Sequence, residues 1–284
     1  SDIMIVGKKY GISVPSGDIP VLSVPLVLTI DGTNYVDDGT LVPQQLITAL
    51  RAAKSQPSTA CPSPAQYADA MSGEDDCFVV TLSANLSGSY QSAVAGMELK
   101  TGSGRVHIFN SCSASAGEAG IAYYVAELIG KGLSFEHIVA QVRGYQNHCH
   151  ILFFLESMNN LARNGRVNPA VAKIASVLGI RACGDAQNGQ IIPTQKPRGQ
   201  KKATETLAAM IRERGFTNSS WLRIAHCFGE TQAQLLIDAL KKDFPDARYT
   251  LEPTGALCSF YAEEGGLMIA MEGGFNQVNN VNDI

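Results

Sequence analysis

Hydroxyl and amide side chains gather in one short segment of this chain, residues 82–93. The segment follows the apolar run 78–80 and leads into residues that favour a helix. A strand, a polar turn and a helix start in this order direct free backbone N–H groups and hydroxyls at one place. That place suits a phosphate, a carboxylate or an oxyanion, although the spacing fits a well-capped helix equally well. The candidate binding residues are Ser83, Asn85, Ser87 and Gly88.

A second serine-rich loop covers residues 110–117 and contributes Ser111 as a candidate binding residue. It follows the strand-like run 105–109 and precedes another helical segment. The carboxyl ends of parallel strands meet at one edge of an open α/β sheet, and ligands bind at that edge. Two loops of the same chemistry at one edge favour an anion site over two ordinary caps. They do not identify the anion.

The elements of the first half predict an α/β domain, residues 1–150, with a parallel sheet flanked by helices. Residues 78–82 are apolar without alternation, which is typical of a strand buried on both faces. The run 21–30 is expected to form one strand, and with a short return at 35–36 it gives a small β insert of about residues 21–40.

The second half, residues 151–284, predicts an α+β domain with a mostly antiparallel sheet and helices on one face. Short strand-like runs flank the turn Asn188–Gly189, a dipeptide typical of β-hairpins. Helices are expected over 155–164 and 169–178. The boundary between the two domains is placed near residue 150.

Composition excludes several classes of protein. The 284 residues suffice for two domains, and 45% hydrophobic with 17% charged residues indicates a folded chain. A net charge of −4 gives no basic excess for binding nucleic acid. The longest apolar run, 19–30, is too short to span a membrane. No secretion leader is recognised at the N-terminus.

Cysteine and histidine usage gives no metal site. The seven cysteines are widely spaced, odd in number and without a C-x-x-C pair, which favours reduced thiols in a cytoplasmic protein. His148 and His150 would share one face of an extended segment, but further ligands are not apparent nearby.

Ser87, Arg198 and Tyr261 each have more than one possible role. Ser87 lies where a hydrolase nucleophile would, but the G-x-S-x-G elbow is absent and no histidine has a convincing setting as its base. Phosphate loops of the dinucleotide and Walker types are absent as well. Arg198 is either an anion clamp or part of a solvated basic helix start. Tyr261 is either the polar tip of a pocket or an aromatic beside a turn.

Several motifs occur together in one order, and with them the chain resembles the DegV family of fatty-acid-binding proteins over nearly its whole length. The segment 82–93 is very similar to the family's L-S-S-x-L-S-G-T-Y-Q-S-A and is the most specific match. The other matching segments are 59–64, 110–117, 155–167, 198–203 and 265–270.

The resemblance implies a two-domain α/β protein that buries a long acyl chain between its domains. In the family, the carboxylate is held by the residues that match Thr59 and Ser87. The resemblance implies no catalytic residue, metal or cofactor, and it implies that a dihydroxyacetone-kinase-like partner phosphorylates the bound acid. By the same resemblance, Arg198 would contact that kinase or the acyl phosphate.

The chain departs from the family motifs at three places. Tyr261 replaces the family histidine, and Glu263 and Glu264 replace the following Gly-Pro. The usual T-D-S near the N-terminus is absent, with Gly7-Lys8-Lys9 at the nearest place, and Asn110 replaces an aspartate. A phenol can donate a hydrogen bond to a carboxylate, whereas the two new carboxylates would repel an anion if they faced the site.

From the resemblance we expect a bacterial, cytoplasmic fatty-acid carrier. The alternatives are a serine-dependent acyl hydrolase or transferase using Ser87, and a carrier of another apolar acid.

Overall fold

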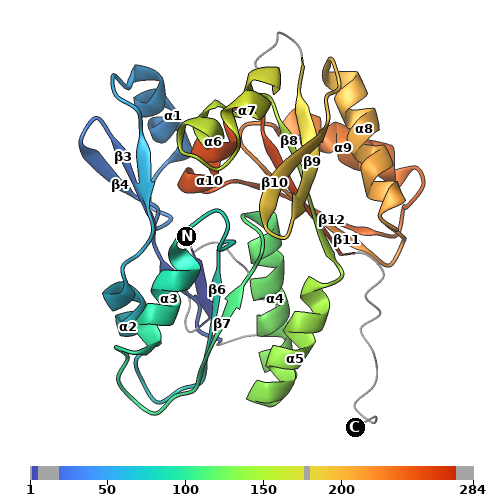
Figure 1. Ribbon diagram of the computed structural model, residues 1–284. Helices are drawn as coiled ribbons and strands as arrows, with labels where there is room; N and C mark the ends of the chain where they lie inside the picture. The colour runs from blue at the N-terminus through green and yellow to red at the C-terminus, as the bar shows by residue number, and fades with distance from the viewer. Residues whose placement is uncertain (1, 6–18, 176–179, 273–284) are drawn as a thin grey trace.

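Two parallel strands carry the two serine-rich loops. In the computed structural model, which describes residues 2–5, 19–175 and 180–272, β6 (Cys77–Thr81) pairs in parallel with β7 (Val106–Asn110) (Figure 1). Thr81 lies opposite Asn110, so both loops leave the sheet at the same edge. The parallel pairing of β6 and β7 and the shared edge of their loops are confirmed.

Two further strands extend this sheet in the antiparallel sense. β1 (Asp2–Ile5) pairs with β6 and with β2 (Leu22–Val24), which gives the order β2-β1-β6-β7. The prediction of one strand over 21–30 was wrong. Pro25 has no N–H to give to a ladder, so β2 ends before it and the chain enters a different sheet.

That second sheet has three strands in the order β4-β3-β5. Its strands are β3 (Val27–Ile30), β4 (Thr33–Val36) and β5 (Ser58–Ala60). β3 and β4 form the expected small hairpin, and β5 adds a strand from beyond residue 40. Leu28 packs with α1 (Pro43–Ala52) and with α10 (Ala256–Ala262), which comes from the other end of the chain. The domain division near residue 150 stays a prediction.

Helices cover both faces of the first sheet. α2 (Pro64–Met71) and α3 (Ser89–Met97) pack on the face of Val79, whereas α4 (Ala116–Gly130) and α5 (Phe135–Gln146) pack on the face of Val80. All of β6 is buried. The unbroken apolar run therefore reflects a strand between two helical layers, as expected.

The third sheet has six strands in the order β10-β9-β8-β13-β11-β12. Its strands are β8 (Cys149–Leu155), β9 (Ala182–Gln187), β10 (Gln190–Gln195), β11 (Trp221–His226), β12 (Arg248–Pro253) and β13 (Leu267–Glu272). Only β11 and β12 pair in parallel, so the sheet is mostly antiparallel, as predicted. Asn188 and Gly189 have the positive φ angles that a tight hairpin turn requires.

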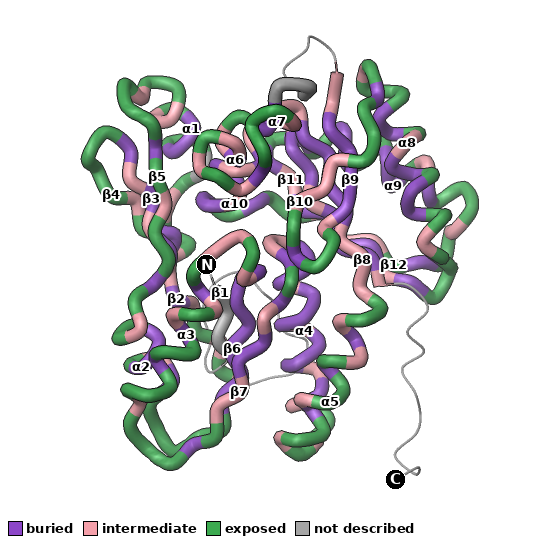
Figure 2. The backbone as a smooth tube through the Cα atoms, viewed as in Figure 1, coloured by how far each residue is buried: buried purple, intermediate pink, exposed green. Residues whose placement is uncertain are grey.

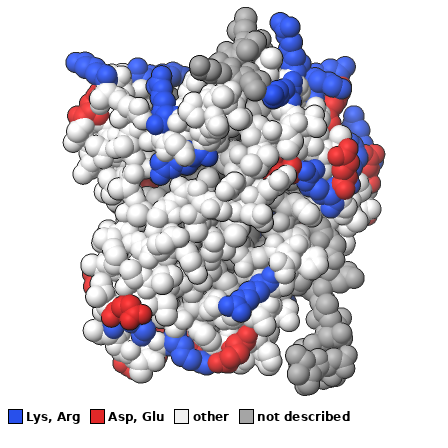
Figure 3. Space-filling view, in the orientation of Figure 1, with Lys and Arg blue, Asp and Glu red and all other residues white. Residues whose placement is uncertain are grey.

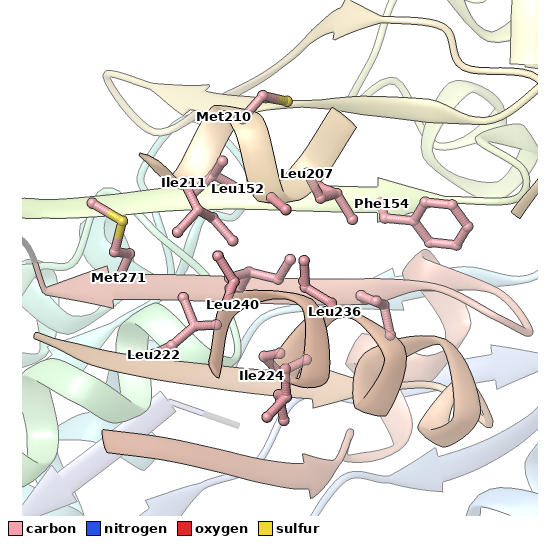
Figure 4. Close-up of a cluster of buried hydrophobic side chains, with 14 of the residues drawn as sticks. Leu152, Phe154, Leu207, Met210, Ile211, Leu222, Ile224, Leu236, Leu240 and Met271 are labelled. Atoms are coloured by element: carbon pink, nitrogen blue, oxygen red, sulfur yellow. The ribbon is translucent and has the colours of Figure 1, made fainter. Parts of the chain in front are cut away.

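One face of the six-stranded sheet packs against α8 (Gln200–Glu213) and α9 (Glu230–Lys241). Figure 4 shows apolar side chains of the strands meeting those of the two helices. Contrary to the expectation, helices also lie on the opposite face, where α4 and α10 approach it.

Two short helices follow β8. α6 (Asn159–Arg163) begins later than the predicted helix 155–164, because Leu155 is the last residue of β8. α7 (Pro169–Ala175) matches the start of the helix predicted over 169–178, whose last residues lie outside the described part of the chain.

α4 connects the first and third sheets. It contacts β1 and β6 on one side and β8, β11 and β13 on the other, and Figure 2 shows that most of it is buried. Gly117 makes the close approach possible, since a Cβ there would lie 2.3 Å from Cδ1 of Ile151.

Charge is distributed unevenly over the surface. On the face shown in Figure 3, the described Lys and Arg side chains lie among Asp and Glu toward the top and bottom, with a broad uncharged region between them. None of the helices in the described ranges is both long and apolar enough to cross a membrane.

Adjacent leucines on α9 test the packing of the third sheet. Leu236 is fully buried and Leu235 is 46% exposed. We expect Leu236→Ala to lower the free energy of unfolding by about 3 kcal/mol, since it leaves a cavity in the core. Leu235→Ala is the matched control and should change it by less than about 0.5 kcal/mol. Chemical denaturation measures both, and equal losses would contradict this packing.

Candidate ligand-binding site

An apolar cavity lies between the loop of residues 82–87, the six-stranded sheet and α10. Its volume is about 110 Å³. Side chains from all three parts form its walls, including Leu82, Ile151, Phe153, Leu257 and Met268. Leu26, between β2 and β3, adds to them. β8 lines the cavity between Ile151 and Leu155, mostly through the face that carries Ile151, Phe153 and Leu155.

The polar groups of the cavity include a hydrogen-bonded pair. Oγ1 of Thr59 lies 2.7 Å from the hydroxyl of Tyr261. Thr59 is the central residue of β5, and Tyr261 lies in the last turn of α10. The small sheet and α10 therefore bring together two predicted site residues that are about 200 positions apart in the sequence.

Ser87 lines the same cavity from the serine-rich loop. The N–H groups of Leu86 and Ser87 both donate to the carbonyl of Ser83, at 2.9 and 3.0 Å, and this turn holds Ser87 in place. Oγ of Ser87 lies 2.9 Å from Oγ of Ser89. Gly88 is exposed at the start of α3 and is not among the lining residues.

Two other predicted binding residues hold the β9–β10 hairpin instead. Oγ of buried Ser83 donates to the carbonyl of Gly189 at 2.8 Å, and Nδ2 of Asn85 donates to the carbonyl of Asn188 at 2.7 Å. Because Ala186 and Ile191 of this hairpin line the cavity, the two hydrogen bonds fix one of its walls.

Ser111 also has a structural position. Its hydroxyl donates to the carbonyl of Ser113 and accepts from the N–H of Ser113. Ser113 itself lines the cavity, and its carbonyl accepts from the N–H of Ser83 at 2.8 Å, so the two loops are joined directly.

Arg198 lies elsewhere. It is exposed, precedes α8 and forms an isolated bridge with Ile180. It is not among the residues that line the cavity.

Arg166 is a site residue that sequence reasoning missed. It is the only charged residue among those that line the cavity in the described part of the chain. Its Nε donates to the carbonyl of Leu86 and its Nη1 to that of Asn164, and its guanidinium carbon lies 5.6 Å from the centre of the Tyr261 ring. Its segment, 155–167, matches a family motif, but that match by itself assigns no role to Arg166.

The two glutamates that follow α10 do not line the cavity. Oε1 of Glu263 accepts from the N–H of Asn160 at 2.9 Å, and Glu264 forms an exposed ion pair with Arg51. The carboxylates of Glu263 and Glu264 therefore do not face the cavity, where they would repel an anion.

The fold and the cavity define an α/β protein with an internal apolar site and polar groups from three separate segments. The chain belongs to the DegV family: the family's sequence model, described as "Uncharacterised protein, DegV family", matches residues 18–272. A DegV domain-containing protein of Streptococcus pyogenes is 35% identical over 253 residues, covering 88% of this chain and 90% of the relative.

Two solved structures with bound ligands are similar throughout. A DegV family protein of Eubacterium eligens, loaded with heptadecanoic acid, is 32% identical with a TM-score of 0.83, covering 88% of this chain and 92% of that one. The Streptococcus pneumoniae Fatty Acid Kinase B3 protein, loaded with linoleic acid, is 33% identical with a TM-score of 0.84, covering 88% and 90%. These neighbours and the family model confirm the resemblance inferred from the motifs.

The contact between the hairpin and the serine-rich loop can be tested at Gly189. Its φ is +76°, and a Cβ would lie 2.2 Å from Oγ of Ser83. Gly132 has a similar φ of +73° with open space around it. We expect Gly132→Ala to cost about 1 kcal/mol of stability, as a positive φ does.

Gly189→Ala should cost about 1–2 kcal/mol more than this control, because Ser83 must also move and lose its hydrogen bond. Thermal and chemical unfolding give both values. Equal losses of unfolding free energy in the two variants would show that the turn does not depend on its contact with Ser83.

Proposed function

We propose that this protein binds one long-chain fatty acid, with the acyl chain in the apolar cavity and the carboxylate at the polar groups. The observation that carries the proposal is an apolar cavity whose polar lining brings together Thr59, Ser87, Arg166 and Tyr261. The bound fatty acids of the two neighbouring structures support it.

The chemistry of the lining matches the two halves of such a ligand. Each methylene removed from water contributes about 0.8 kcal/mol, which the apolar walls supply. A buried carboxylate is costly unless hydrogen bonds and an opposite charge compensate it. Hydroxyls can donate the hydrogen bonds, and Arg166 brings the positive charge.

Tyr261 changes the head-group chemistry relative to the family histidine. Its hydroxyl, already 2.7 Å from Oγ1 of Thr59, can donate to a carboxylate while it accepts from Thr59. The phenol can therefore fill the hydrogen-bonding role at this place, and Arg166 fills the electrostatic one.

We further propose that the bound carboxylate is presented to a dihydroxyacetone-kinase-like fatty-acid kinase, which phosphorylates it. The similarity to the Streptococcus pneumoniae Fatty Acid Kinase B3 protein supports this step. Arg198 is exposed and outside the cavity, so it is suited to contact the kinase and not the bound acid.

The proposal requires no catalytic group in this chain. Of the described residues that line the cavity none is a histidine, and the hydroxyl of Ser87 lies beside that of Ser89. This arrangement favours a carrier over the alternative of a serine-dependent acyl hydrolase or transferase. A carrier of another apolar acid would use the same cavity.

Ser87 and Tyr261 test the head-group site. We expect Ser87→Ala and Tyr261→Phe each to weaken fatty-acid binding about tenfold, since each removes one hydrogen bond to a carboxylate. Native mass spectrometry with extraction of the ligand measures retention, and titration with hexadecanoic acid measures affinity. Ser103→Ala is a control on an exposed loop whose residues do not line the cavity.

Purified protein that neither retains nor binds any fatty acid would overturn the carrier proposal. Ester turnover with a covalent acyl group on Ser87 would instead establish the hydrolase alternative. Retention of a different apolar acid, weakened by the same two substitutions, would favour the alternative of a carrier for another apolar acid.

The kinase step is tested separately at Arg198. We expect Arg198→Ala to leave fatty-acid affinity unchanged and to lower kinase-dependent formation of acyl phosphate by at least about tenfold, a loss of about 1.4 kcal/mol. Arg212→Ala, an exposed arginine of α8 paired with Asp243, is the matched control. Full phosphorylation with Arg198→Ala would remove Arg198 from the proposed contact.

A further inference from the structure

Ser87 has a close hydroxyl neighbour that does not line the cavity. Oγ of Ser89 lies 2.9 Å from Oγ of Ser87, and the N–H of Ser89 donates to Oγ of Ser87 at 3.2 Å. Ser87 lines the apolar cavity, whereas Ser89 is fully buried at the start of α3 and is not among the lining residues. The two side chains therefore form a pair in which one member faces the ligand and the other is enclosed by protein.

The hydrogen bond between these two hydroxyls can run in either direction. A serine hydroxyl has one proton to donate and two lone pairs that accept. If Ser89 donates, its N–H and its hydroxyl occupy both lone pairs of Ser87, and the proton of Ser87 is available to the cavity. If Ser87 donates, it offers the cavity only a lone pair, which a carboxylate cannot use because it has acceptors alone.

Burial decides between the two directions. In the part of the chain that the structure describes, the hydrogen bond of Oγ of Ser89 is the one with Ser87. If Ser87 were the donor, the proton of Ser89 would be buried without an acceptor, which is costly. Because Ser89 is fully buried, neither bulk water nor a ligand in the cavity can supply that acceptor. Ser89 is therefore the donor and Ser87 the acceptor.

From this geometry we propose that Ser89 is a positioning residue of the head-group site: it donates to Ser87 and so fixes the hydroxyl of Ser87 as a donor toward the cavity. The consequence is selection by head group. A carboxylate fits such a donor, whereas the hydroxyl of a fatty alcohol finds no lone pair on Ser87 for its own proton. The proposal rests on the proposed fatty-acid binding at Ser87 and adds to it a residue that the ligand does not touch.

The other hydroxyl pair of the site is arranged differently. The hydroxyl oxygens of Thr59 and Tyr261 are 2.7 Å apart, and both residues line the cavity. A ligand can therefore reach either of them, and the direction of their hydrogen bond can change with the ligand. In the pair of Ser87 and Ser89 one partner is out of reach, so there the protein itself sets the direction.

Removing the hydroxyl of Ser89 should change the preference for the head group. In Ser89→Ala, Ser87 regains a free lone pair, and its proton is neither fixed nor polarised by a second hydroxyl. We expect the affinity for hexadecanoic acid to fall about threefold and that for hexadecanol to rise about threefold. The ratio of the two dissociation constants then changes by about tenfold in favour of the alcohol.

The experiment is a titration of the full chain and its variants with hexadecanoic acid and with hexadecanol, which have acyl and alkyl chains of equal length. Ser89→Thr keeps a hydroxyl, and threonine stands at this position in the family motif, so this variant should keep the ratio. When Ser87 is already alanine, adding Ser89→Ala should change the ratio by less than about twofold, because the group that Ser89 positions is gone.

Ser220 provides the matched control. It is buried, its Oγ accepts from the N–H of Thr217 at 3.0 Å, and it lies 3.2 Å from Oγ1 of the same residue. Ser220→Ala thus removes one hydroxyl of a similar pair away from the residues that line the cavity, and it should leave the ratio unchanged.

The outcomes separate this inference from the proposed function. If the chain binds hexadecanoic acid and Ser89→Ala leaves both affinities unchanged or lowers them equally, Ser89 does not set the direction of the hydrogen bond and the inference is wrong. If Ser89→Ala does not fold, Ser89→Cys, whose thiol is a weak donor, takes its place and should shift the ratio in the same direction. If the unchanged protein does not bind the acid, the proposed function fails and this inference fails with it.

Discussion

The close packing of α4 between two sheets is the constraint on which the cavity depends. At Gly117 the helix approaches β8 so closely that a single added carbon would overlap Ile151. The second serine-rich loop leads directly into this helix, and it is joined to the first loop by the hydrogen bond from Ser83 to Ser113. The contact therefore places both loops over the face of the six-stranded sheet, and the space left between the loops and the sheet is the apolar cavity.

The serine-rich loop divides its work between structure and binding. Ser83 and Asn85 donate hydrogen bonds to the two carbonyls of a hairpin turn and so join the turn to the loop. Ser87, four residues after Ser83, is left to face the cavity. One short segment thus fixes the opposite wall and also supplies a hydroxyl for a head group, which explains why so many polar residues occur in it.

Local sequence predicted the parallel strands, the helices around them and the Asn188–Gly189 hairpin, because each depends on neighbouring residues. Local sequence could not show which hydroxyls line the cavity and which only hold the loops in place. Spacing places Ser83, Ser87 and Ser111 in loops at one edge of the sheet. Which of these hydroxyls bonds to the β9–β10 hairpin depends on segments that are distant in the sequence. The same limit applies to Arg166, whose position depends on the carbonyl of Leu86, 80 positions away. The family motifs supplied Thr59 and Tyr261, whose contact no local pattern predicts.

α10 has only seven residues, yet it contributes to the cavity at two places. Tyr261 in its last turn contacts Thr59, and Cys258, one turn earlier, lines the same cavity. The helix is tied at its start by Asp37, which comes from the small sheet. Divergence within this one segment can alter two neighbouring positions of the cavity lining at once, whereas changes in the serine-rich loop are restrained by the hairpin it supports. Ligand range in this lineage is therefore most open to evolutionary change in a helix that makes up a small part of the chain.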